Sequence, residues 1–228
     1  ESIIENYVDK ILIAKTSGKV WFTTKNYPGI NCLERWYNED SGQFESQFNH
    51  LENDIIDKNS LANNNISTFI EDRAGNIWIG TYGGGVSFYS NNESKFASIS
   101  YDPENEWGLK NNNIFSISSL SYGDMMWVAN DYGLEQISSE GSREYDYSKL
   151  TLDVNNINVV KSINDHILWV GTDRGILKIN SNTDEIIRFN SNEDILPQYR
   201  IIDNLIYDLE ISKNGYLWAG TESGIVVI

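Results

Sequence analysis

Cysteine, proline, histidine and basic residues are all scarce in this chain of 228 residues. The single cysteine, Cys32, excludes an internal disulfide framework and a cysteine-ligated zinc site. Only His50 and His166 are present, so neither a histidine-rich metal site nor a Ser-His-Asp triad has obvious members. Three prolines and no low-complexity tract leave little room for a linker, and we expect a single domain over residues 1–228.

Basic residues are fewer than acidic residues. The chain has 17 Lys and Arg against 33 Asp and Glu, a formal net charge of −16. This balance argues against nucleic acid, because a phosphate backbone requires clustered Lys and Arg. No run of 18 apolar residues occurs, so we expect no membrane insertion of this segment. The first residues lack a basic stretch followed by an apolar one, so we expect a secretory signal to be absent or removed, and the chain to be a fragment or a processed form.

What the sequence does contain is a repeat. A tryptophan within a short apolar run, followed by a glycine turn and a second apolar run, recurs at Trp21, Trp78, Trp127, Trp169 and Trp218. The separations are 57, 49, 42 and 49 residues, close to the roughly 40–50 residues of one four-stranded propeller blade. With no sustained helical periodicity, the sequence predicts an all-β chain, a β-propeller of four-stranded antiparallel blades. The approximate repeats are residues 8–48, 65–101, 113–147, 156–189 and 204–228.

Each repeat has the same internal order. An asparagine opens an apolar strand, as in Asn65-Ile66, and a short polar turn such as Asp72-Arg73-Ala74-Gly75 leads into the tryptophan strand. Two apolar runs joined by so short a glycine turn indicate a β-hairpin. A third apolar strand and a more polar outer strand follow, and we expect the tryptophans to pack between blades. The fifth repeat ends after three strands, so we expect residues 1–7 to supply its missing outer strand if five blades close into a ring.

The repeat unit resembles a known family, the two-component regulator propeller. The run from Asp72 to Val86, DRAGNIWIGTYGGGV, resembles the central part of the family's repeat, and Lys58 to Ile66 resembles its loop into the next blade. The resemblance covers nearly all of the chain. The first repeat departs most, with Pro28-Gly29 in its turn, and the third has Ala129-Asn130 in place of Gly-Thr.

The resemblance implies a function. Propellers of this family are the periplasmic, ligand-sensing parts of bacterial membrane-bound sensors, and their inferred ligands are commonly oligosaccharides. They usually have seven blades, followed by an immunoglobulin-like module, a membrane helix and an output enzyme. The resemblance therefore implies a sensor without catalytic residues or a cofactor of its own. Its partners would be a small molecule or oligosaccharide, the missing blades and C-terminal modules of the same protein, and a possible homodimer.

Propeller geometry selects one face for a ligand. The loop leading into each first strand and the turn joining the second and third strands emerge together, and ligands favour such loop-built mouths. The asparagines of these loops repeat in every blade, which indicates a turn role. The residues that vary between copies are the candidate binding residues, with ordinary surface variation as the competing explanation. They are Tyr82, Asp131, Asp173, Arg174 and Glu222.

Two further aromatic residues lie in polar loops, Trp107 and Tyr199. Each is either a ligand contact or an anchor that packs its loop on its own blade. The carboxylates of Asp102, Glu104 and Glu106 could supply oxygen ligands to calcium. The glycine and further carboxylates of a calcium-binding loop are missing, so we expect no metal site.

Two alternatives stay open at this stage. A non-catalytic propeller scaffold for protein contacts would show exposed apolar side chains on one face. An enzyme resembling streptogramin lyase would need a histidine at the central mouth.

Overall fold

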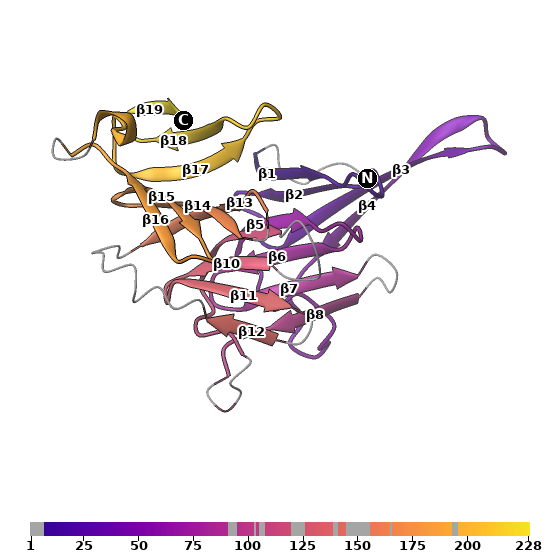
Figure 1. The fold of residues 1–228 in the computed structure, drawn as a ribbon. Helices are drawn as coiled ribbons and strands as arrows, with labels where there is room; N and C mark the ends of the chain where they lie inside the picture. Colours follow the sequence, from indigo (N-terminus) through magenta and orange to yellow (C-terminus); the bar gives the residue numbers. More distant parts are fainter. Residues whose placement is uncertain are drawn as a thin grey trace. The chain divides into compact units, whose positions relative to one another are not determined.

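The computed structural model describes residues 7–90, 95–102, 104, 108–119, 126–138, 141–144, 156–164, 166–192 and 196–228. Apart from one short 3-10 helix, Pro197–Tyr199, the regular elements named in these residues are strands, which confirms the all-β prediction. The strands form five antiparallel sheets, and in each sheet the spatial order follows the chain order (Figure 1). We call these sheets blades 1 to 5.

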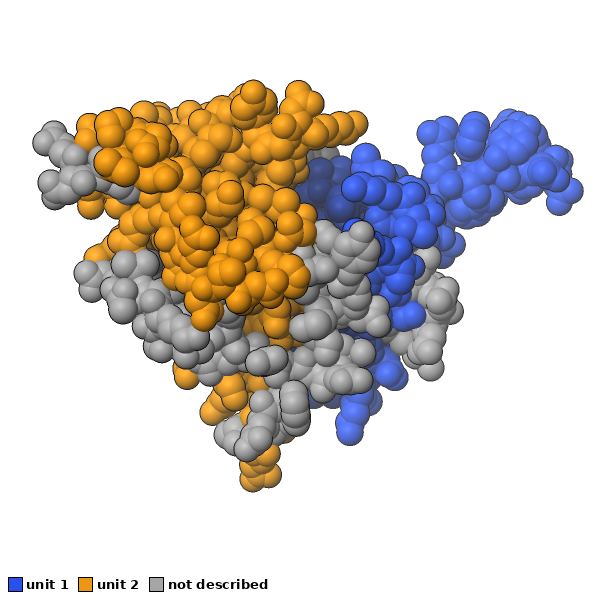
Figure 2. Space-filling view, in the orientation of Figure 1, with its two compact units in different colours: residues 1–100 blue, residues 101–228 orange. Residues whose placement is uncertain are grey.

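The first compact unit comprises residues 1–100, blue in Figure 2. Blade 1 contains β1 (Val8–Ile13), β2 (Val20–Thr24), β3 (Ile30–Asn38) and β4 (Gln43–Leu51). Blade 2 contains β5 (Ile66–Glu71), β6 (Ile77–Thr81), β7 (Gly85–Ser90) and β8 (Lys95–Ile99).

The second compact unit comprises residues 101–228, orange in Figure 2. Blade 3 contains β9 (Ile114–Ser119), β10 (Met126–Asn130), β11 (Leu134–Ser138) and β12 (Gly141–Glu144). Blade 4 contains β13 (Ile157–Ser162), β14 (Ile167–Thr172), β15 (Gly175–Asn180) and β16 (Glu185–Phe189). Blade 5 is three-stranded, with β17 (Ile206–Ile211), β18 (Leu217–Thr221) and β19 (Gly224–Val227).

The repeated turn before each tryptophan strand depends on its first polar side chain. In blade 2, the Asp72 carboxylate accepts hydrogen bonds from the Asn76 backbone N–H (2.9 Å) and from the Trp78 indole N–H (2.9 Å). In blade 4, Asn164 accepts from the backbone N–H groups of His166 and Ile167, both at 2.9 Å. These side chains satisfy turn donors that would otherwise lack a partner, which explains why a polar residue recurs there.

The Gly-Thr pair after the tryptophan secures the next turn. The hydroxyls of Thr81, Thr172 and Thr221 donate to the backbone oxygens of Gly85, Gly175 and Gly224, at 2.9, 2.8 and 3.0 Å. Three of the five blades thus hold their second turn with the same bond.

Blade 3 holds this turn differently. Asn130 replaces the threonine, and its Oδ1 atom accepts the N–H groups of Tyr132 and Gly133 at 2.9 Å. Its amide nitrogen donates to Glu135, whose side chain is fully buried and whose carboxylate also accepts the Lys110 N–H at 3.1 and 3.2 Å. The departure from Gly-Thr therefore comes with a buried acid that joins the turn to the loop leading into the blade.

Four of the five repeated tryptophans are buried, as predicted, and one is not. Trp21, Trp78, Trp127 and Trp169 are between 0% and 7% exposed. Trp218 is 45% exposed, so the prediction that it packs between blades is wrong for this chain. The register places Trp218 on one face of blade 5 with Ile225 and Val227, which are 68% and 48% exposed. The physical reason is that, among the described residues, no further sheet covers this face.

The predicted closing strand lies mostly outside the described residues, which begin at Tyr7. Blade 1 is complete without it, because β1 to β4 comprise four strands. Blade 5 has three, and in the described residues β19 pairs only with β18. The clasp between residues 1–7 and blade 5 therefore stays a prediction.

Deleting residues 1–6 is expected to lower the melting temperature or to cause self-association, because the edge of blade 5 would lose its proposed partner. This deletion leaves β1 and the Lys25 N–H to Tyr7 oxygen bond (3.1 Å) in place. The measurements are differential scanning calorimetry and sedimentation velocity. An unchanged, monomeric variant with the parent's melting temperature would show that no clasp exists.

Candidate functional site

The arrangement of loops predicted from the repeat order is present within each unit, and its role in ligand binding stays a prediction. At one end of every blade, the loop leading into the first strand lies against the turn that follows the second strand; we call this end the loop face. The Tyr82 N–H donates to the Asn65 oxygen at 2.9 Å, and the Asp173 N–H donates to the Asn156 oxygen at 3.4 Å. The Asn113 side-chain amide donates to the Asp131 carboxylate at 2.7 Å.

Consecutive blades are also joined at this face. The Gly29 N–H of blade 1 donates to the Asn64 oxygen at 2.9 Å, and the Gly175 N–H of blade 4 donates to the Asn204 oxygen at 2.7 Å. Both glycines have a positive φ, of 90° and 114°. A Cβ atom on Gly29 would lie 2.5 Å from the Leu51 oxygen, so no larger residue fits there without a backbone shift.

The side chains that cap these loops belong to residues two positions before the predicted asparagines. Asn63 Oδ1 accepts the Asn65 N–H at 2.8 Å, and Asn111 Oδ1 accepts the Asn113 N–H at 2.6 Å. Asp203 takes the same position before blade 5 and accepts the Leu205 N–H at 3.1 Å. The Ser223 hydroxyl donates to Asp203 at 2.7 Å, and this bond is the main cause of the lowered pKa of the Asp203 carboxyl.

Five predicted binding residues lie on turns of the loop face. Tyr82 belongs to the first unit and is 43% exposed. Asp131, Asp173, Arg174 and Glu222 belong to three consecutive blades of the second unit. The Oδ1 atom of Asp173 is buried and, within the described part of the chain, has no hydrogen-bond partner. Trp107 lies outside the described residues.

Tyr199 is held against its own blade. It ends the short helix Pro197–Tyr199, and its ring meets Phe189 edge-on at a centroid distance of 5.3 Å. The two segments also exchange backbone hydrogen bonds, Asn190 N–H to Tyr199 oxygen at 3.2 Å and Ile201 N–H to Asn190 oxygen at 2.9 Å. This geometry is that of a loop anchor, and a ligand contact by Tyr199 stays a prediction.

A pocket of about 460 Å³ opens on the loop face of the first unit. We call it the loop-face pocket. Its walls come from the start of blade 1, from the β2–β3 turn and from the loop into blade 2, and include Tyr7, Asp9, Thr23, Lys25, Tyr27, Asn63 and Asn64.

The aromatic rings of this pocket are fixed by their neighbours. The Lys25 ammonium lies 5.1 Å from the centre of the Tyr7 ring, within cation–π range. The Tyr27 ring packs on His50 at 4.4 Å, and its backbone oxygen accepts the Thr24 hydroxyl at 3.2 Å. Thr23 is 5% exposed, and its hydroxyl oxygen has no hydrogen-bond partner in the described part of the chain. The pocket thus combines aromatic faces, amides, hydroxyls, one cation (Lys25) and one carboxylate (Asp9).

Sequence reasoning did not find this pocket. It compared positions across similar repeats, and the pocket lies where blade 1 departs most from the others. The available signal was the departure itself, because blade 1 has the longer segment Asn26-Tyr27-Pro28-Gly29 in its second turn.

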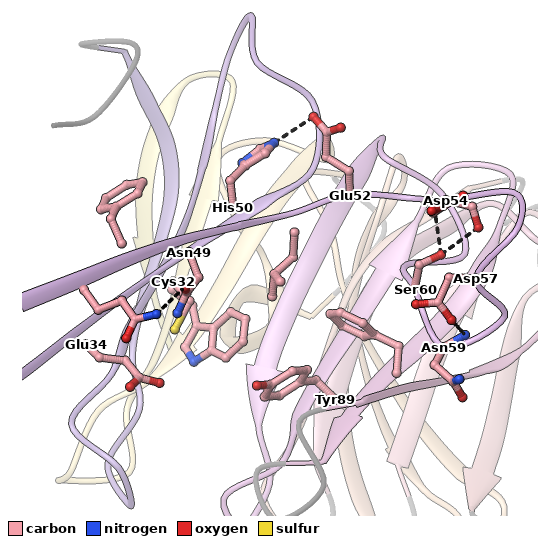
Figure 3. A pocket seen from close by; sticks show the side chains of 15 residues that line it. Cys32, Glu34, Asn49, His50, Glu52, Asp54, Asp57, Asn59, Ser60 and Tyr89 are labelled. Atoms are coloured by element: carbon pink, nitrogen blue, oxygen red, sulfur yellow. Dashed lines mark hydrogen bonds and ion pairs between the residues drawn. The ribbon is translucent and has the colours of Figure 1, made fainter. Parts of the chain in front are cut away.

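A second pocket, of about 660 Å³, lies between the outer strands of blades 1 and 2 (Figure 3). His50 bridges Asn31 and Glu52 there, with both contacts at 2.8 Å. Ser60 donates to the Asp54 backbone oxygen at 3.0 Å, and the Asn59 N–H donates to the Asp57 carboxylate at 2.9 Å. Cys32 also lines this pocket, and burial raises the pKa of its thiol to about 11. The thiol is therefore protonated and weakly nucleophilic at neutral pH.

Within the described residues, no group of three or more His, Cys, Asp or Glu side chains could hold a metal ion. The same part of the chain contains no helix with the length and hydropathy of a membrane span.

The fold and the repeated turns are those of a β-propeller built from four-stranded blades. Residues 60–83 match the family described as "Two component regulator propeller", which confirms the resemblance seen in the sequence. The matched segment runs from the loop before blade 2 to its second turn and contains Asp72, Trp78 and Thr81, whose bonds hold that blade.

Particular proteins resemble the chain over most of its length. It is 28% identical over 182 residues to "Histidine kinase P4" of Formosa agariphila, a match that covers 74% of this chain and 12% of that protein. The extracellular domain of BT3049 from B. thetaiotaomicron, described as a hybrid two component system, superposes with a TM-score of 0.74 at 23% identity, covering 98% of this chain and 28% of that one. PorZ of Porphyromonas gingivalis, described as a surface component of the type-IX secretion system, has a TM-score of 0.60 at 15% identity. This match covers 97% of this chain and 32% of that one.

In each of these similar proteins, the matched region is only part of a longer chain. The chain spans about an eighth of the histidine kinase and less than a third of either structure. The blades are thus a partial propeller, and the prediction that they belong to a larger one agrees with this finding.

Proposed function

We propose that this chain is part of the extracytoplasmic, periplasmic sensing propeller of a bacterial two-component receptor. In this proposal it binds a glycan fragment or a similar small molecule and relays binding to a C-terminal output module by favouring one arrangement of the receptor. The support is the family match at residues 60–83, the similarity to a histidine kinase, and the fold shared with the extracellular domain of a hybrid two component system.

The loop-face pocket is the observation that best supports a glycan as the ligand. Sugars present apolar C–H faces to aromatic rings and hydroxyls to amides, and Tyr7, Tyr27, Asn63 and Asn64 supply both kinds of partner. The net charge of −16 favours neutral ligands, since a polyanion would meet repulsion over much of the surface.

In the proposal, the predicted loop-face residues select the ligand within their own units. Tyr82 does so in the first unit, and Asp131, Asp173, Arg174 and Glu222 do so in the second, with Trp107 and Tyr199 as further aromatic contacts. No residue is assigned a catalytic role, and the proposal requires no cofactor or metal.

Isothermal titration calorimetry against a panel of neutral and sulfated oligosaccharides tests the proposal. The Tyr7→Ala variant is expected to bind the best neutral ligand about tenfold more weakly or worse, because it loses a stacking face. Tyr207→Ala is the matched control, since Tyr7 and Tyr207 are 58% and 57% exposed and Tyr207 lies on β17. Tight, calcium-independent binding of a sulfated glycan, or equal losses in both variants, would contradict the proposal.

A scaffold for protein contacts is the second candidate. The exposed apolar face of blade 5, with Trp218, Ile225 and Val227, favours it, and PorZ shows that the fold also occurs in a protein described as a surface component of a secretion system. The lyase-type alternative has less support, because neither histidine is among the residues that line the loop-face pocket.

A further inference from the structure

The outer hairpin of blade 1 extends beyond its own sheet. β2 pairs with β3 only from Asn31 to Leu33, whereas β3 and β4 continue to pair as far as Asn38 and Gln43. The pairs from Glu34–Gln47 to Asn38–Gln43 therefore form a two-stranded arm, which projects from the first unit in Figures 1 and 2. At about 3.4 Å per residue, these five pairs span about 17 Å.

The tip of the arm is a well-bonded turn. Asn38 Oδ1 accepts the N–H groups of Asp40 and Ser41 at 2.9 and 3.2 Å, and the Gly42 N–H donates to the Asn38 oxygen at 2.9 Å. Gly42 has a φ of 65°, which a glycine adopts without strain. The arm is thus a defined element of the fold.

One face of the arm carries a stripe with three aromatic residues, Tyr37, Phe44 and Phe48. The register places Leu33, Arg35 and Tyr37 of β3 opposite Phe48, Ser46 and Phe44 of β4, all on one face. The stripe begins in the core, where Phe48 meets Phe22 edge-on at 5.5 Å.

The outer end of the stripe is exposed. Tyr37 and Phe44 pack edge-on at 5.3 Å, yet remain 55% and 63% exposed. An isolated two-stranded hairpin is only marginally stable in water, so an apolar face on such an arm gains stability when a partner covers it.

The arm also carries unpaired charges of both signs. The Arg35 guanidinium lies 4.5 Å from the centre of the Phe44 ring, and among the described residues it forms no ion pair. Stacking leaves the edge of a guanidinium free to bind a carboxylate. The tip carboxylates of Glu39 and Asp40 likewise have no cationic partner in the described residues.

We propose that the arm is a homodimerisation element, in which the aromatic stripes of two copies pack face to face in antiparallel orientation. A two-fold axis through the Tyr37–Phe44 pair makes the interface isologous. Arg35 lies two positions toward the base from Tyr37, and Glu39 lies two positions toward the tip. In an antiparallel pair, Arg35 of each copy therefore faces the tip carboxylates of the other.

This charge complementarity favours a second copy of the chain as the partner that covers the stripe. Each arm supplies one cation and two anions at the positions where its symmetry mate needs them, and aromatic residues and arginine are enriched at interfaces. Because each arm is only five residue pairs long, we expect the buried area to fall below the ~1,200 Å² of a stable interface and the dissociation constant to be on the order of 10⁻⁴ M. The proposal is independent of the ligand and of the sensing role.

Sedimentation equilibrium of the whole chain over a wide concentration range tests the dimer through a charge swap. Arg35→Glu alone, and Glu39→Lys with Asp40→Lys, are each expected to weaken dimerisation about tenfold or more, because each homodimer then has two like-charge contacts. An equimolar mixture of the two variants is expected to regain it, because the heterodimer has opposite charges at both contacts.

Further variants separate the stripe from other surfaces. Tyr37→Ser with Phe44→Ser is expected to abolish dimerisation, whereas Trp36→Ser, on the opposite face of the arm, leaves it unchanged. Ile225→Asp controls for association through the exposed face of blade 5. A chain that stays monomeric throughout, a dimer lost only with Ile225→Asp, or a mixture that fails to regain dimerisation would each overturn the proposal.

Discussion

Replacing Trp78 by alanine is expected to lower the free energy of unfolding by about 3–5 kcal/mol, the usual cost of emptying a large aromatic site. The indole is 4% exposed, packs edge-on against Phe88 at 4.7 Å and donates to Asp72 at 2.9 Å. The variant therefore loses packing and leaves the Asp72 carboxylate with one donor fewer. Urea unfolding followed by circular dichroism measures the change without relying on tryptophan fluorescence.

The chain provides a matched control for this variant in the same unit. Trp36 is 42% exposed on the arm, and Trp36→Ala is expected to cost less than about 1 kcal/mol. Trp169→Ala and Trp218→Ala form the equivalent pair in the second unit, at 7% and 45% exposed. Similar losses for the buried and exposed members would refute the packing role of the repeated tryptophan.

Replacing Glu135 by alanine is expected to cost about 3 kcal/mol or more, because it removes a fully buried, charged acceptor from its hydrogen-bond donors. These donors include the part-buried Lys110 backbone N–H, at 3.1 and 3.2 Å, and the side-chain amide of Asn130. The same urea unfolding experiment measures the loss.

Blade 2 provides the control for this variant. Ser87 lies at the equivalent position of β7, is fully buried, and accepts the Ala62 N–H at 3.0 Å. Ser87→Ala removes a neutral hydrogen bond and is expected to cost about 1 kcal/mol. If Glu135→Ala costs no more than Ser87→Ala, the carboxylate does not hold the turn of blade 3 to its loop.

Much of the fold was predictable because it depends on local signals. The repeat spacing, the Asp72 turn and the glycine turns act over a few residues, and the structure confirms strands where they predicted strands. The exposed Trp218 was not predictable from its repeat, because its burial depends on a neighbour and not on the local sequence.

The candidate site was predictable only in part. The repeat order located the loop face correctly, since the positions of both sets of loops follow from strand order. The loop-face pocket was missed, because Tyr7, Tyr27 and Asn64 come from three separate segments that only the packing of blades 1 and 2 brings together.

By itself, the sequence determined the class of fold, the number of repeats and the turn chemistry that blades 2, 4 and 5 share. These features depend on hydrogen bonds and apolar periodicity within about ten residues, so a single sequence contains them. Only the tertiary structure decided which tryptophans are buried, where the loop face is hollowed, and that the β3–β4 hairpin carries its aromatic stripe beyond the sheet. Those outcomes depend on contacts between distant segments and on which surfaces lack a neighbour, and neither is encoded in local periodicity.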